Sequence, residues 1–172
     1  MEDILDRNLR GMTEAVRRNE ITSVDLVQGF LDRIEKVNSS LNAVVSINTE
    51  IALKLAAKAD SDLKEGIVHG PLHGIPMTIK DSLDTKDMVT TWGTKGRETF
   101  RPGRDATSVA RLRDAGAILL GKTNTPEFTL SFQTDNLVYG RTNNPYNLEM
   151  TPGGSSGGAA ALIAANAIPF DI

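Results

Sequence analysis

The sequence has 172 residues, of which 40% are hydrophobic and 24% charged, which suits one sizeable buried core and excludes a disordered chain. Its 19 Lys and Arg residues against 22 Asp and Glu residues leave a formal charge of −3, too balanced for a partner such as nucleic acid or an anionic membrane. With 0 cysteines, disulfides, thiolate zinc sites and a cysteine nucleophile are excluded. Since no leader-like or membrane-spanning apolar run is present, we expect a cytoplasmic protein.

The N-terminal part of the chain, residues 1–65, is predicted to be a helical segment on the outside of the domain. Apolar residues recur at helical spacing between Ile4 and Asn19, and a stronger apolar stripe runs from Val24 to Val37. Thr22 and Asp25 stand ahead of that stripe in the pattern of a capping box. Two surface helices covering a core are therefore expected.

A strand and a third helix complete this segment. The alternating stretch Asn42–Ile47 predicts a short strand. The helix that follows is expected to bury one face, marked by Ile51, Leu55, Ala59 and Leu63.

Shorter elements make up residues 66–172, which we interpret as the first part of an α/β core. After a Gly- and Pro-rich loop come a strand at IPMTIK, a helix over Thr107–Ala115, a strand at AILLG and an alanine-rich helix. Strands that alternate with helices predict a mixed, buried β-sheet flanked by helices.

Two apparent motifs in this part do not indicate a ligand site. The segment Gly116–Thr123, GAILLGKT, matches a phosphate-loop pattern, but four apolar residues separate its glycines where a phosphate loop needs exposed amides. It is better read as a core strand that ends at a turn. His69 and His73 are the only histidines, and Gly70 and Pro71 break any helix that would place both on one metal. No metal or other cofactor is expected.

Lys80 and the GGSSGG segment are the candidates for chemistry. Lys80 ends an apolar strand, so its amine should reach the carboxyl end of the sheet, where open α/β sheets place their sites. Ser155 and Ser156 lie between glycine pairs directly before an almost wholly apolar, helix-forming run. Glycines at the start of a buried helix allow close backbone approach, which favours a site over a flexible linker.

Four blocks together resemble the amidase signature family, whose members hydrolyse or transfer carboxamides with a serine–cis-serine–lysine triad. In order, these blocks are GIPMTIKD (74–81), GKTNTPEF (121–128), GRTNNPYN (140–147) and TPGGSSGGAAAL (151–162). The resemblance implies the amidase signature fold, here incomplete, and a small-molecule amide as substrate of the complete enzyme.

By position, the resemblance makes Lys80 the base and Ser155 the bridging serine that relays the proton. It also implies a cis peptide bond from Gly154 into Ser155, and Ser156 is expected to add a second hydrogen bond to the amine. A lysine base must be neutral near pH 7, so its pKa has to fall from about 10.4 by about three units. A buried stem and serine hydroxyls are expected to supply that change.

The same resemblance leaves one triad member unassigned. In the family the nucleophilic serine follows the bridging serine by about two dozen residues, and Ser82, Ser108 and Ser131 do not occupy that place. We therefore expect an N-terminal fragment that is inactive alone, and that self-associates or requires a missing C-terminal half.

Two other functions stay open. One is the A-type subunit of an aminoacyl-tRNA amidotransferase, although the run TPEFTLSFQT departs from the usual pattern and favours a general amidase. The other is a non-catalytic folding or interaction module.

Overall fold

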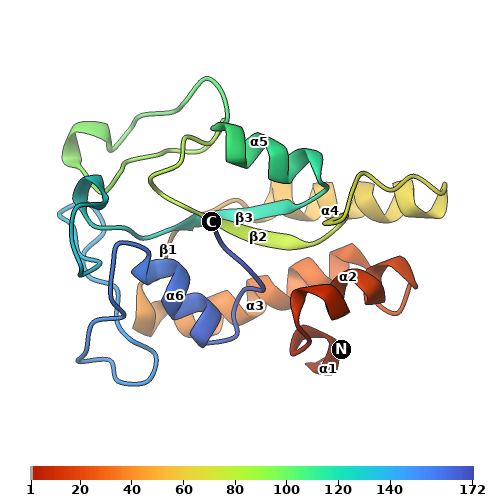
Figure 1. Cartoon of the computed structure of the whole chain (residues 1–172), viewed down its shortest axis with the longest axis horizontal. Helices are drawn as coiled ribbons and strands as arrows, with labels where there is room; N and C mark the ends of the chain where they lie inside the picture. The colour runs from red at the N-terminus through yellow and green to blue at the C-terminus, as the bar shows by residue number, and fades with distance from the viewer. Residues whose placement is uncertain (1) are drawn as a thin grey trace.

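The computed structural model describes residues 2–172 and has the predicted α/β architecture (Figure 1). Its helices are α1 (Glu2–Leu5), α2 (Leu9–Arg17), α3 (Ser23–Leu41), α4 (Thr49–Lys64), α5 (Thr107–Asp114) and α6 (Gly157–Ala164). Its strands are β1 (Val44–Ile47), β2 (Pro76–Lys80) and β3 (Ile118–Thr123), and two short 3-10 helices are η1 (Lys95–Arg97) and η2 (Glu127–Thr129).

The three strands form one mixed sheet, as predicted, and their order in it is β1-β3-β2. Central β3 runs antiparallel to β1 and parallel to β2. All six residues of β3 are buried, so the GAILLGKT segment is a core strand and presents no phosphate loop. Helix α5 covers one face of the sheet, and α2, α3 and α6 lie on the other (Figure 1).

Helix α3 supplies much of the larger core, and its start confirms the N-cap of the predicted capping box, although Oδ2 of Asp25 accepts from the Thr22 hydroxyl in place of the backbone amide. Thr22 is the N-cap, and its Oγ1 accepts a hydrogen bond from the amide of Asp25 over 3.0 Å. The apolar stripe is fully buried at Leu26, Val27, Phe30 and Ile34. Burying apolar side chains of this size typically contributes about 1.5–3 kcal/mol each, so this face anchors the helix to the sheet.

Two details of the helical segment differ from the sequence prediction. The pattern between Ile4 and Asn19 is split into α1 and α2, because Asn8 starts a new helix by accepting the amide of Gly11 over 2.9 Å. The predicted face of α4 is wrong in its first half, because Ile51 and Leu55 are 47% and 44% exposed, and right in its second, because Ala59 is buried and Leu63 packs against the core. In the first half the helix buries its small residues Ala52 and Ala56 instead.

Three segments distant in sequence meet at the carboxyl end of β2. They are the end of β2 itself, the start of α6, and the last residues of the chain, which run beside β2 (Figure 1). Within residues 2–172, no helix combines the length and apolar character that a membrane crossing requires.

Candidate active site

The structure brings Lys80 and the serine pair together. Lys80 is the last residue of β2, and its Nζ donates to Oγ of Ser155 over 2.7 Å and to Oγ of Ser156 over 3.0 Å. Ser155 is partly buried, whereas Ser156 is exposed. The peptide bond between Gly154 and Ser155 is cis, the geometry that the family resemblance implies.

Two glycines allow the serine segment to sit this close to its neighbours. A Cβ on Gly154 would lie 2.7 Å from the carbonyl oxygen of Ser131, and one on Gly158 would lie 2.5 Å from the amide nitrogen of Asn124. Both distances are shorter than real side chains tolerate. Glycine is therefore required on both sides of the serines by backbone packing.

Buried threonine side chains also hold the backbone of this segment. Thr125 donates its hydroxyl to the carbonyl of Ser155 over 3.2 Å. Thr134 donates to the carbonyl of Gly153 over 3.0 Å and accepts from the amide of Gly157 over 2.9 Å. Because these side chains are buried, their hydrogen bonds fix the backbone around Ser155 more firmly than exposed bonds would.

The electrostatics around Lys80 favour the loss of its charge. Partial burial lowers the pKa of the Lys80 amine, and the negative charge of Asp171 opposes that change by raising it. Neither serine carries a negative charge that would stabilise the ammonium form of Lys80. When the Lys80 amine is neutral, it can accept the proton of the Ser155 hydroxyl. The arrangement is chemically suited to proton transfer between Nζ and a hydroxyl.

Sequence reasoning missed three residues near this pair: Thr125, Thr134 and Asp171. Thr125 and Thr134 lie in the loops after β3, where nothing in the local pattern distinguishes a buried threonine from an exposed one. Asp171 follows a short apolar stretch, and a lone carboxylate in such a position is a signal that could have found it.

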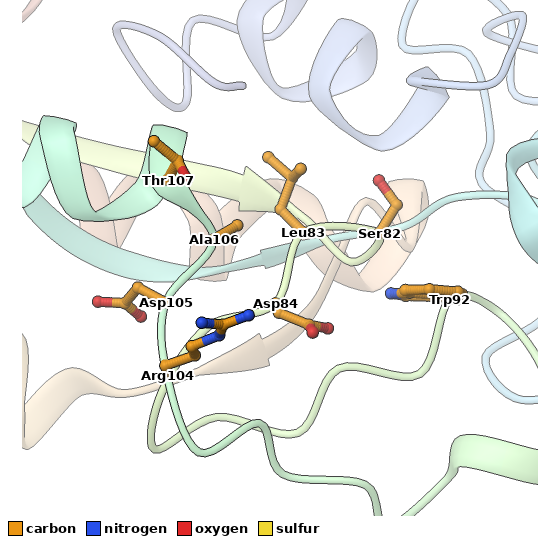
Figure 2. A pocket seen from close by; sticks show the side chains of 8 residues that line it. All are labelled: Ser82, Leu83, Asp84, Trp92, Arg104, Asp105, Ala106 and Thr107. Atoms are coloured by element: carbon orange, nitrogen blue, oxygen red, sulfur yellow. The ribbon is translucent and has the colours of Figure 1, made fainter.

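A hollow of about 360 Å³ lies beyond the carboxyl end of β2 (Figure 2). Ser82 and Leu83 follow the strand, and charged groups of Asp84, Arg104 and Asp105 line the opposite side. Neither Lys80 nor Ser155 lines this hollow. It is therefore separate from the lysine–serine pair.

The histidines are engaged within the protein, away from the serine segment. His69 Nε2 lies 2.6 Å from Oδ2 of Asp62, and His73 Nδ1 accepts the amide of His69 over 3.2 Å. Nε2 of His73 lies 3.0 Å from the carbonyl of Ala59. Among the described residues, no group of three or more potential metal ligands forms a metal site.

Comparison with known proteins identifies the family of the chain. The family model described as Amidase matches residues 25–172. The A-type subunit of the glutamyl-tRNA(Gln) amidotransferase of Desulfatibacillum aliphaticivorans is 45% identical over 153 residues, which cover 89% of this chain and 31% of that protein. Its counterpart in Coxiella burnetii is 44% identical over 163 residues, which cover 95% of this chain and 34% of that protein.

Solved structures give the same result in three dimensions. The native peptide amidase of Stenotrophomonas maltophilia superposes with a TM-score of 0.89 at 37% identity, covering 95% of this chain and 35% of that one. A bacterial aryl acylamidase of the amidase signature family has a TM-score of 0.90 at 31% identity, with coverages of 96% and 34%. This chain thus spans about a third of the length of the relatives it matches, and it belongs to the amidase signature family.

Proposed function

We propose that this chain provides the base and the proton relay of an enzyme that cleaves carboxamide C–N bonds. Lys80 is the base and Ser155 the bridging serine, while Ser156 and Gly154 position them. The observation that carries the proposal is the 2.7 Å contact between Nζ of Lys80 and Oγ of Ser155. Membership of the amidase signature family supports the same reaction class.

The proposed chemistry is a reversible proton relay. Neutral Lys80 takes the proton of Ser155 while Ser155 takes the proton of a nucleophilic hydroxyl, so Ser155 stays neutral and Lys80 becomes an ammonium. In the reverse direction the relay delivers a proton to the leaving amine of the amide. No histidine is needed, because burial already lowers the pKa of Lys80.

Competitive acylation tests the base directly on this chain. Amine-directed labelling across a range of pH, read residue by residue by mass spectrometry, should show Lys80 becoming reactive at lower pH than exposed Lys36 or Lys54. Lys80 labelling that follows the same pH curve as these two exposed lysines would contradict the proposal. The variant Ser155→Ala, which keeps the site small, should change the Lys80 curve and leave the two control curves in place.

We further propose that the 172-residue chain alone has no amidase turnover. Ser82, Ser108 and Ser131 do not lie at the position that the family resemblance gives the nucleophile, and triad members act as a unit. Assays with simple carboxamides should therefore give the same background rate for the chain and for Lys80→Ala. Turnover that Lys80→Ala abolishes would refute the proposed inactivity and would support the assigned base.

A second candidate is the A-type subunit of a tRNA-dependent amidotransferase, favoured by sequence relatives of that name at 41–45% identity. An assay of amide transfer to glutamyl-tRNA, with the complete protein and partner subunits, distinguishes this candidate from a general amidase. A general amidase releases ammonia from simple amides without tRNA. A third candidate is a non-catalytic interaction module. It predicts that neither reaction occurs and that Lys80 is labelled like the exposed lysines.

We also propose a cytoplasmic location and self-association of the isolated chain. The cysteine-free composition is compatible with a reducing compartment. Exposed apolar side chains between residues 128 and 150 support association.

A further inference from the structure

The last residues of the chain form a short extension of the sheet beside β2. The amide of Lys80 donates to the carbonyl of Ile172 over 2.8 Å, and Thr78 and Asp171 form a parallel bridge. Side chains of bridged residues point to the same face of a sheet, and residues two apart in a strand share that face. Asp171 is thereby placed on the face of the sheet that carries Thr78 and Lys80.

The carboxylate of Asp171 is held by two buried hydroxyls. Thr78 Oγ1 donates to its Oδ2 over 2.7 Å, and Thr123 Oγ1 donates to the same oxygen over 3.0 Å. Both threonines are fully buried, and Thr123 stands opposite Lys80 in the β2–β3 register. The carboxylate is therefore fixed by hydroxyls on the two neighbouring strands, on the face of the sheet that carries Lys80.

Asp171 and Lys80 influence each other by charge. Burial raises the pKa of Asp171 to about 6. This pKa is lowered, against the effect of burial, by the hydroxyls of Thr78 and Thr123 and by the charges of Lys80 and Lys122. Asp171 in turn raises the pKa of Lys80 against the effect of burial. These two lysines are the charged groups that act on Asp171, whereas Lys80 is faced by Asp171 and by the hydroxyls of Ser155 and Ser156.

We propose that Asp171 is a positioning residue that stabilises the ammonium form of Lys80 during proton transfer. The inference rests on the proposed function, because the ammonium forms only if Lys80 accepts the proton of Ser155. A fixed carboxylate stabilises that developing positive charge, as the aspartate of a Ser-His-Asp triad stabilises the protonated histidine. Asp171 itself keeps its protonation state in this step.

Lysine side-chain titration by NMR tests the coupling on the 172-residue chain itself. In the unmodified chain, the Lys80 resonance should show its own titration and a second, smaller inflection near pH 6, where Asp171 titrates. In Asp171→Asn, which retains a side-chain oxygen to accept from the threonines, the inflection near pH 6 should vanish and the pKa of Lys80 should fall.

The matched control is Asp32→Asn, which removes the same charge from an exposed position on α3 and should leave the Lys80 titration unchanged. An unchanged Lys80 titration in a folded Asp171→Asn chain would overturn the inference. Absence of the inflection near pH 6 in the unmodified chain would overturn it without any variant. In either case a low labelling pH for Lys80 would still support the proposed function, so the two failures are distinguishable.

Discussion

Lys122 lies in a motif that resembles a phosphate loop, but its contacts give it a structural role. Its side chain is fully buried, and its Nζ donates to the carbonyl of Leu83 over 2.6 Å and to Oγ1 of Thr85 over 2.8 Å. The sequence pattern GKT suggests a phosphate ligand, but the ammonium instead holds the loop that follows β2. Burial lowers the pKa of Lys122 to about 8 and raises that of the neighbouring carboxyl of Asp81.

Removal of one member of this buried pair should destabilise the fold more than removal of both charges. Among the described residues, Oδ1 of Asp81 has no hydrogen-bond partner, and it lies 4.0 Å from Nζ of Lys122, so Lys122→Met leaves a buried carboxylate without this counter-charge. We expect that variant to lose about 3–5 kcal/mol in the free energy of unfolding. Urea denaturation at about pH 7 measures the loss.

The matched control is the double variant Lys122→Met with Asp81→Asn. It should recover part of the stability, because the uncompensated charge is gone, although the hydrogen bonds of Lys122 remain lost. Equal losses in the single and double variants would show that the electrostatic coupling does not matter.

Helices α3 and α4 show which elements the sequence predicts correctly and where it fails. In α3 large apolar residues form one stripe, which is buried in its middle and partly buried at its ends, Val24 and Val37, against the same core. In α4 the small residues pack inward, because the helix lies against α3 and β3, and Ile51 and Leu55 are left half-exposed. Hydrophobicity scales rank leucine above alanine. A periodicity argument therefore cannot detect a helix face that is buried because its small side chains let the helix pack closely against its neighbours.

In the candidate site, too, the sequence indicates some residues and misses others. Lys80, Ser155 and Ser156 were recognisable because each lies in a motif whose chemistry is local in sequence. Asp171 acquires its role only when residues 170–172 align beside β2, a contact across 93 positions to Thr78. Long-range pairing of this kind leaves no periodic trace, so the sequence offers Asp171 only as a lone carboxylate after an apolar stretch and does not show its partners.

Substitutions at two neighbouring positions of α4 should therefore affect stability in the reverse of the order that hydrophobicity suggests. Ala56→Leu adds volume at a position with no exposed surface and should cost about 1–3 kcal/mol in the free energy of unfolding. Leu55→Gln, one residue away, should change stability by no more than about 0.5 kcal/mol. Thermal or urea unfolding of both variants gives the comparison, and a larger loss in Leu55→Gln would mean that the helix is rotated from its described orientation.

Over the whole molecule, exposed apolar side chains are concentrated in residues 128–150, which run from η2 toward the GGSSGG segment. Phe132 is 92% exposed, and Leu130, Leu137 and Tyr146 are each at least 80% exposed. Single exposed apolar residues are common on monomers, but a concentration of large ones marks an interaction surface. The segment adjoins the site, because a Cβ on Gly154 would lie 2.7 Å from the carbonyl oxygen of Ser131 and 2.8 Å from the carbonyl carbon of Phe132.

We expect the 172-residue chain to associate with itself as its concentration rises, because burying these side chains between copies removes apolar surface from water. Sedimentation velocity over a wide concentration range should show a shift from monomer to larger species, and raised salt should not reverse it, since the contacts are apolar. Replacing Leu130 and Phe132 together by serine should move the shift to higher concentration. Replacing Ile51 by serine, which removes an exposed apolar side chain from α4 instead, should leave it unchanged. A chain that stays monomeric throughout, with or without the substitutions, would show that residues 128–150 are an ordinary solvated surface.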